Sequence, residues 1–177
     1  MLKCPSKKAT CIGLTIFFIG GVSFGGLNLF FDYTNRTDFC LSCHSMQTNY
    51  DEYKQTVHYK NKAGVAASCA DCHVPKSFFP KFASKIVAAK DVFYEMIGSI
   101  DTPEKLEARR WQMANHVWER MRATDSRECR DCHDYAAMDE SKQDKLTLNK
   151  HQQAPMRGKT CIDCHSGIAH EEPLMPD

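Results

Sequence analysis

The chain has 177 residues, a length typical of a single domain. Charged residues make up 25% of it and the formal net charge is +1, so the composition excludes an acidic tail and a basic nucleic-acid-binding domain. Ten cysteines are many for this length and indicate a disulfide scaffold, a zinc protein or a haem carrier. The spacing of the cysteines decides among these three classes.

An uncharged run covers residues 9–31. As a helix it would be about 34 Å long, enough to cross a hydrocarbon core of roughly 30 Å. A cleaved signal peptide is the alternative, but its apolar region is shorter and ends in small residues, whereas residues 27–31 include bulky leucines and phenylalanines. We therefore predict a retained transmembrane anchor in a lipid bilayer.

The charges beside this run predict its orientation. Three lysines lie within residues 1–8, and the first acidic residue, Asp32, follows the run. By the positive-inside rule, residues 1–8 form a cytoplasmic tail and residues 32–177 lie outside the cytoplasm. Within the run, Gly21 and Gly25 form a G-x-x-x-G pattern that lets membrane helices approach closely, so a homo-oligomer through this segment is a further expectation.

Eight of the ten cysteines repeat the pattern C-x-x-C-H four times. They are Cys40, Cys43, Cys69, Cys72, Cys129, Cys132, Cys161 and Cys164. The histidines that complete the motifs are His44, His73, His133 and His165. This pattern is the attachment signature of c-type haem, in which two thiols form thioethers to one porphyrin and the adjacent imidazole can bind its iron. Zinc ribbons do not require that histidine, and a disulfide framework explains neither the histidine nor the repeated spacing. We predict four covalently bound haem c groups.

The four motifs begin 29, 60 and 32 residues apart. This spacing predicts two di-haem halves, residues 32–98 with haems 1 and 2 and residues 99–177 with haems 3 and 4. The histidines outside the motifs are His58, His116, His151 and His170. Because haem iron needs sixth ligands and neutral imidazole is a common one, their number allows complete bis-histidine ligation without establishing any pairing.

The predicted fold class is mainly α with much irregular loop. Four large macrocycles in so short a domain are expected to form most of its core, wrapped by short helices and loops. No alternating run of β-branched residues indicates a strand. We therefore expect one N-terminal transmembrane helix plus a haem-packed tetrahaem domain.

Two longer helices are predicted inside that domain. In residues 81–97 apolar side chains recur along one helical stripe, with lysines near or on it. This helix lies either at the membrane surface or against a haem, and the sequence favours neither. A second helix begins where Thr102 precedes Pro103 and runs to about Arg122. It carries His116, for which a structural role competes with iron ligation.

The uncleaved anchor ahead of four C-x-x-C-H motifs, with residues 40–46, 99–105 and 161–170, resembles the NapC/NirT family of tetrahaem quinol dehydrogenases. The resemblance covers essentially the whole chain and is strongest to the NapC branch, then to the N-terminal part of the TorC branch. It implies a protein of the bacterial inner membrane with a periplasmic haem domain. Such proteins oxidise menaquinol or ubiquinol and pass electrons singly to a periplasmic terminal reductase or its cytochrome subunit. Nitrate reductase is the expected partner, with trimethylamine N-oxide or nitrite reductase as alternatives.

Two other functions compete with this one. A multihaem reductase acting directly on nitrite or a related small substrate would need an open iron site, and the familiar nitrite reductases carry a C-x-x-C-K motif, which this sequence lacks. A haem-delivery or redox-sensing anchor would have no use for four haems. We expect quinol oxidation rather than terminal reduction.

The resemblance also implies distal iron ligands. His170 lies five residues after His165, too close to reach comfortably over the ring of the same haem, so we expect it to bind a neighbouring haem. His58 and then His151 follow by the same resemblance, and His116 ranks last.

The haem at Cys40 and Cys43 is attached soon after the membrane run, so we predict that it lies closest to the bilayer and accepts electrons from quinol. In one branch of the family a methionine two residues after the motif histidine ligates this haem, and here that residue is Met46. A thioether ligand raises the reduction potential relative to bis-histidine ligation. The alternative is ligation by His44, with Met46 packed on the ring.

Quinol oxidation also needs a proton acceptor within hydrogen-bond reach of the quinol hydroxyl. Asp91, in the helix 81–97, resembles the family acid that approaches the open side of the first haem. Burial beside an apolar ring raises the pKa of a carboxyl group, and a nearby lysine lowers it. We predict Asp91 as the proton acceptor, with Lys85 or Lys90 orienting the quinol. The alternative is a charge pair on a solvated helix face.

Overall fold

The computed structural model describes residues 6–175, and every regular element in that range is helical. The predicted fold class is therefore confirmed. Residues 1–5, which include most of the predicted cytoplasmic tail, lie outside the described range, as do residues 176–177. The α-helices are α1 (Lys7–Thr34), α2 (Thr37–Cys40), α3 (Met46–Tyr53), α4 (Cys69–His73), α5 (Phe78–Met96), α6 (Pro103–Ala123), α7 (Arg127–Arg130) and α8 (Lys145–Gln153). Four short 3₁₀ turns follow α7, namely η1 (Tyr135–Ala137), η2 (Glu140–Lys142), η3 (Pro155–Arg157) and η4 (Cys161–Asp163).

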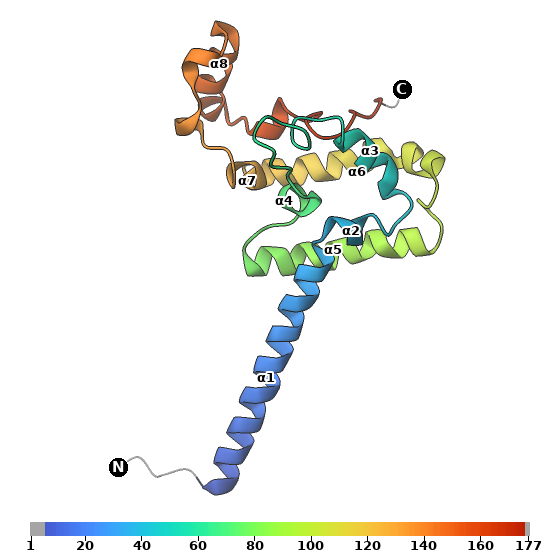
Figure 1. The fold of residues 1–177 in the computed structure, drawn as a ribbon, viewed down its shortest axis with the longest axis vertical. Coiled ribbons are helices and arrows are strands. Elements are labelled where there is room, and N and C mark those ends of the chain that lie inside the picture. The colour runs from blue at the N-terminus through green and yellow to red at the C-terminus, as the bar shows by residue number, and fades with distance from the viewer. Residues whose placement is uncertain (1–5, 176–177) are drawn as a thin grey trace.

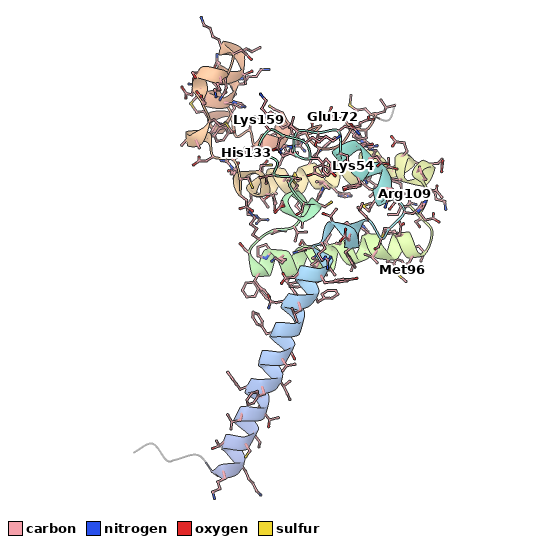
Figure 2. The ribbon with its side chains drawn as sticks, viewed as in Figure 1. Lys54, Met96, Arg109, His133, Lys159 and Glu172 are labelled. Carbon is pink, nitrogen blue, oxygen red and sulfur yellow. The ribbon has the colours of Figure 1, made fainter. Side chains whose placement is uncertain are left out.

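The first helix, α1, extends away from all the others (Figure 1). It begins after Ser6, whose Oγ accepts a hydrogen bond from the backbone N–H of Ala9 at 3.3 Å. Its 28 residues make it about 42 Å long, since the helix continues beyond both ends of the predicted run 9–31. Side chains project from it on all sides into open space (Figure 2). By length and composition α1 can cross a membrane.

The helix α5 lies across the C-terminal end of α1 (Figure 1). Phe31 of α1 is only 3% exposed, and its ring centre lies 6.1 Å from that of Phe78 and 6.2 Å from that of Phe82. Burial of one phenylalanine stabilises a fold by about 1.5–3 kcal/mol. The Lys85 ammonium also donates to the Thr34 carbonyl at 2.9 Å. These contacts join the predicted anchor directly to the amphipathic helix.

The helix α6 begins where the sequence predicts. Thr102 accepts a hydrogen bond from the backbone N–H of Lys105 at 3.4 Å, and Pro103 opens the helix. Leu106 and Met121 of this helix are buried. In Figure 1, α5 and α6 lie at two levels, with α2 and α4 between them and α8 at the end of the domain far from α1.

Few apolar side chains of the described range are fully buried. They are Phe31, Tyr53, Ile100, Leu106, Met121 and Ile162. The protein chain alone does not form a conventional side-chain core for a domain of this size, because cores of that kind bury contiguous apolar clusters.

Candidate haem and quinol sites

Each haem motif lies on a short helix or turn, and neighbouring motifs in the chain are neighbours in space. The helix α2, which ends at Cys40, contacts α4, and α4 contacts α7. The Cys69 thiol, through a hydrogen bond, raises the pKa of Cys40. Burial, followed by the nearby Cys161 thiol, raises the pKa of Cys129 to about 11. The attachment segments therefore run in the order one, two, three, four through the domain.

Two of the motifs carry their own helix cap. In the second motif, Ser68 accepts from the backbone N–H of Asp71 at 3.3 Å, and the Asp71 carboxylate accepts from the backbone N–H of Ser68 at 2.8 Å. Thr160 and Asp163 form the same reciprocal pair in the fourth motif. This capping role of the aspartates was not predicted from the sequence. The pattern that indicates it is a Ser or Thr followed three residues later by an acid.

The third and fourth motifs are tied together by Ser126. This residue is fully buried in a left-handed conformation with φ 47°. Its Oγ accepts from the Thr160 hydroxyl at 2.6 Å and from the backbone N–H of Ile162 at 3.1 Å. Arg122 of α6 donates to Asp163 at 2.9 Å. The start of each motif is thus fixed relative to the other and to α6.

Three of the four motif histidines face a histidine from outside the motifs. The ring centres of His58 and His133 are 6.1 Å apart. Those of His73 and His170 are 6.2 Å apart, as are those of His151 and His165. Two of these pairs join residues from different predicted di-haem halves, and the third lies within one half. The sequence alone had left every pairing open.

These separations fit two imidazoles on opposite sides of one iron. A metal–nitrogen bond is about 2.0–2.1 Å and the ring centre lies about 1.1 Å behind the nitrogen, so the two ring centres should be about 6.2 Å apart. Within residues 6–175, the buried Nδ1 atoms of His58 and His170 have no hydrogen-bond partner. The residues of these three sites therefore fit a bis-histidine haem.

For three of these imidazoles, those of His58, His73 and His170, burial favours the neutral form that binds iron. Burial, and then the neighbouring His170, lower the pKa of His73 to about 4. Burial is likewise the main cause that lowers the pKa of His58 and of His170. A charged imidazolium offers no lone pair to a metal, so the direction of these shifts suits ligation.

The first motif is built differently. His44 is exposed, and no aromatic or histidine ring of the described chain is paired with it. Instead, Glu95 of α5 accepts from the backbone N–H of His44 at 3.0 Å, from the backbone N–H of Ser45 at 3.4 Å and from the Ser45 hydroxyl at 2.7 Å. Met46 opens α3 directly after this loop and is half-buried. Sequence reasoning missed Glu95, because no local pattern links it to a motif fifty residues earlier.

The helix α5 presents two unlike faces. Asp91 and Glu95 are four residues apart and therefore lie on one side of the helix. Glu95 meets the first motif, whereas Asp91 is exposed, with Arg120 and His116 of α6 among the charged groups that act on it. On another face, side chains seven and four residues apart form an apolar stripe in which each is more than half exposed. These are Phe79, Ile86, Phe93 and Ile97. The sequence allowed this helix to lie either at the membrane surface or against a haem. In the structure its contact with the first haem motif is made from the polar face, through Glu95.

The three predicted quinol-site residues all lie on α5. Partial burial raises the pKa of Asp91, against the opposing effects of Lys90, Arg120 and His116. The Lys85 ammonium is engaged with the end of α1, and burial lowers its pKa. Lys90 is held over the ring of Tyr94 at 5.6 Å from the ring centre. His116, the lowest-ranked ligand candidate, is exposed on α6.

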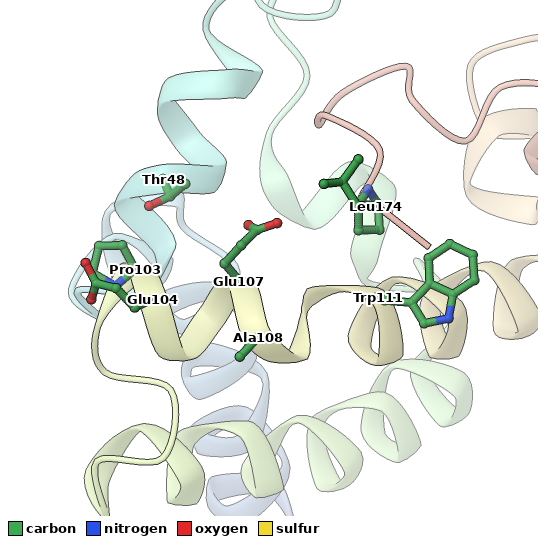
Figure 3. Close-up of a pocket in the computed structure, with 8 residues that line it drawn as sticks. Thr48, Pro103, Glu104, Glu107, Ala108, Trp111 and Leu174 are labelled. Carbon is green, nitrogen blue, oxygen red and sulfur yellow. The ribbon is translucent and has the colours of Figure 1, made fainter. Parts of the chain in front are cut away.

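A cavity of about 680 Å³ opens between α3, α6 and the C-terminal segment (Figure 3). Thr48, Trp111 and Leu174 are among the residues that line it. None of the predicted site residues lines this cavity. The candidate haem sites are therefore defined by the facing rings and motif loops rather than by this pocket.

Comparison with known proteins gives the family. The NapC/NirT cytochrome c family, N-terminal region, matches residues 4–175. A tetrahaem c-type cytochrome of Allochromatium vinosum, described as putative, is 54% identical over 97% of this chain and 94% of its own length. Cytochrome c-type protein NapC of Escherichia coli K12 is 46% identical over 98% of this chain and 88% of its own. The denitrification system component NirT of Stutzerimonas stutzeri is 44% identical over the same shares. No solved structure matches.

Four C-x-x-C-H motifs in spatial sequence, beside one membrane-length helix, define a membrane-anchored multihaem cytochrome c. The chain belongs to the NapC/NirT cytochrome c family, as the sequence resemblance predicted. It is a tetrahaem electron-transport protein with covalently bound haem c.

Proposed function

We propose that this protein oxidises quinol at the periplasmic surface of the bacterial inner membrane and delivers the electrons to a periplasmic terminal reductase in anaerobic respiration. The observation that carries the proposal is the position of the first haem motif. It lies next to α5 and the end of α1, whereas the other three motifs follow in order away from that end. The names of the relatives, NapC and a denitrification component, support the respiratory role.

The membrane arrangement follows from α1 and α5 together. The anchor crosses the bilayer with Lys7 and Lys8 on the cytoplasmic side and Asp32 on the periplasmic side. The exposed apolar stripe of α5 lies in the membrane surface, as is typical of interfacial amphipathic helices. Its continuity with Phe31, Phe78 and Phe82 at the end of α1 supports this arrangement.

The ring pairs support an assignment of the residues that would hold the haem irons. His73 and His170 would hold haem 2, His133 and His58 would hold haem 3, and His165 and His151 would hold haem 4. Ring separations of 6.1–6.2 Å support each pair. For haem 1, whose motif has no facing ring in the described chain, we propose Met46 as the protein ligand, because it opens a helix directly behind the motif loop. The haems supply one-electron carriers when bound.

The chemistry of the quinol site belongs to α5. A quinol loses two protons and two electrons, and Asp91 accepts a proton from its hydroxyl. The raised pKa of Asp91 brings this base closer to the operating pH, which favours proton transfer in both directions. Lys90 or Lys85 orients the quinol oxygen, and Lys85 also fixes α5 to the anchor. The apolar stripe beside these groups admits the quinol ring from the bilayer.

The nitrate reductase of the periplasm is the preferred electron acceptor, with trimethylamine N-oxide and nitrite reductases as alternatives. The similarity to NapC and the shared length support the first choice. A multihaem reductase acting directly on nitrite is the competing function. It would need an open iron site for its substrate, and facing histidines at three motifs leave such a site only at the first.

The test uses the full-length protein in liposomes. Menaquinol or ubiquinol should reduce all four haems, and nitrate, nitrite or trimethylamine N-oxide added alone should leave them reduced. Addition of periplasmic nitrate reductase with nitrate should reoxidise them. If neither quinol reduces the haems, quinol oxidation is contradicted, and reoxidation by nitrite alone identifies the competing reductase.

A further inference from the structure

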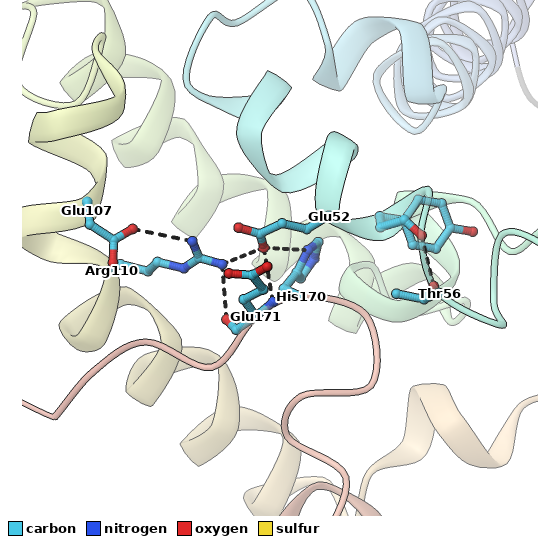
Figure 4. Close-up of polar contacts among 7 residues, drawn as sticks. Glu52, Thr56, Glu107, Arg110, His170 and Glu171 are labelled. Atoms are coloured by element: carbon cyan, nitrogen blue, oxygen red, sulfur yellow. Dashed lines mark hydrogen bonds and ion pairs between the residues drawn. The ribbon is translucent and has the colours of Figure 1, made fainter.

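The chain segment that carries His170 is held by a buried ion pair between two other elements, α3 and α6. Glu52 of α3 and Arg110 of α6 form this pair, and each side chain is only 12% exposed (Figure 4). Burial of such a pair costs desolvation energy, so pairs of this kind rest on further hydrogen bonds. Here those hydrogen bonds go to the C-terminal segment.

Both backbone groups of Glu171 are bound by this pair. The Glu171 N–H donates to Glu52 Oε2 at 3.0 Å, and Arg110 Nη2 donates to the Glu171 carbonyl at 3.0 Å (Figure 4). Arg110 Nη2 also donates to the Glu52 carboxylate. Residue 171 follows His170 directly, so the pair fixes the main chain that aims the His170 ring at His73.

The same carboxylate faces the free side of the His170 ring. Glu52 Oε2 lies 4.0 Å from His170 Nδ1, and the Asn49 backbone carbonyl is the other acceptor that interacts with this ring. Within residues 6–175 the buried Nδ1 makes no hydrogen bond of normal geometry. Metal-binding histidines nearly always donate their second ring N–H to a carboxylate, a carbonyl or water. A shift of about 1 Å brings these two atoms into hydrogen-bond range.

We propose that Glu52 is the positioning residue of the second haem: it accepts the Nδ1–H of His170, fixes the ring with the help of Arg110, and lowers the reduction potential of that haem. The proposal rests on the His73–His170 ligand pair proposed above. A negative acceptor increases the basicity of an imidazole ligand and stabilises the more positive oxidised iron. Arg110 limits this effect, because it shares the charge of Glu52.

This arrangement predicts that two substitutions shift the reduction potential of this haem in opposite directions. In Glu52→Gln the acceptor loses its charge while Arg110 keeps its own, so the potential of one haem should rise. In Arg110→Gln the Glu52 carboxylate keeps its charge without a cation, so the potential of the same haem should fall. A purely structural role would disturb the haem in the same direction in both variants, because both remove the pair.

The matched control is Glu107→Gln. Glu107 pairs with the same guanidinium through Arg110 Nη1 at 3.3 Å, but it is 58% exposed and, among the described residues, makes no hydrogen bond to His170 or Glu171. The experiment is a spectropotentiometric titration of the full-length holoprotein, which measures the reduction potential of each haem. The low-spin spectrum of each haem is recorded in the same samples. We expect one shifted haem in each of the first two variants, of opposite sign, and four unchanged haems in the control.

Four unchanged potentials in Glu52→Gln, or equal shifts in Glu107→Gln, would overturn the proposal. If Glu52→Gln does not assemble its haems, Arg110→Gln still tests the sign. The variant His170→Met separates this proposal from the one on which it rests. Wild-type spectra in His170→Met would remove the ligand pair itself, whereas an altered low-spin haem there with a silent Glu52→Gln would remove only the role of Glu52.

Discussion

The first haem motif and the other three are held by different means. At the second, third and fourth motifs a histidine ring from elsewhere in the chain faces the motif histidine. At the first motif a carboxylate from α5 holds the backbone of the loop, and His44 stays exposed. Two protein ligands for one haem would suit electron transfer. Under the proposed function, the first motif, which has no facing ring in the described chain, is the site that meets quinol, and the other three motifs hold haems that only conduct electrons.

The largest expected effect comes from Asp91 of α5, the proposed proton acceptor. Replacement Asp91→Asn keeps the shape and removes the base, so haem reduction by quinol should slow by about 10²–10⁴-fold, while reduction by dithionite stays normal. Only ionised Asp91 accepts a proton. The wild-type rate should therefore rise with pH through the raised pKa of Asp91, and the variant should lose that rise. Stopped-flow spectroscopy at several pH values measures both.

The control for this prediction is Asp38→Asn. Asp38 is an exposed acid of α2 close to the first motif in the chain, and it pairs with Arg36. Its removal should leave the quinol kinetics unchanged. Wild-type quinol kinetics in Asp91→Asn would show that Asp91 is not the proton acceptor, and would favour the alternative of a charge on a solvated helix face.

The next largest effect is expected from a substitution that gives the first haem a histidine ligand, as proposed for the other three haems. A Met46→His substitution replaces a thioether with an imidazole, so the potential of one haem should fall and quinol oxidation should become less favourable. The other three potentials should stay constant, as should all four in Met156→His, which alters an exposed methionine of η3. A redox titration of both variants measures these four reduction potentials. An unaltered first haem in Met46→His would favour His44 as the ligand.

The carboxylate of Glu95 can be removed to weaken the link between α5 and the first motif. Glu95→Gln removes the charge and leaves one acceptor oxygen for three donors, and hydrogen bonds to charged groups contribute about 1.5–3 kcal/mol. The free energy of unfolding should fall by that amount in denaturant titrations, and amide exchange in residues 44–46 should accelerate. Glu119→Gln, at an exposed position of α6, should change it by less than about 0.5 kcal/mol. Equal stability of the two variants would contradict this role of Glu95.

The smallest effect is expected where α5 meets the anchor. Lys85→Met keeps the apolar stem but loses the hydrogen bond to the Thr34 carbonyl, a loss of about 0.3–1 kcal/mol for a cation at a helix C-terminus. Hydrogen exchange at the end of α1 should become faster. In Lys90→Met it should not, because Lys90 contacts Tyr94 instead. A rise in the KM for quinol in only one of these variants identifies the lysine that orients the substrate.

Features encoded in short stretches of chain were predictable from the sequence. The C-x-x-C-H motifs identify the haem class because both thiols and the imidazole must lie within five residues of one another. The anchor follows from a run of uncharged residues, and the start of α6 follows from Thr102 and Pro103, which act within one turn. The length of α1 was underestimated, since helical hydrogen bonds continue into the polar residues at both ends of the run.

Only the tertiary structure decided which groups meet. His58 faces His133 and His170 faces His73, because packing of α4 on α7 and the Glu52–Arg110 pair bring together segments far apart in the chain. Glu95 reaches the first motif across a similar separation. Local sequence records helix propensity, caps and attachment chemistry, but a pairing between distant segments depends on the summed burial and hydrogen bonding of everything between them. For this reason the four haems could be counted from the sequence, whereas the facing histidine rings appear only in the folded chain.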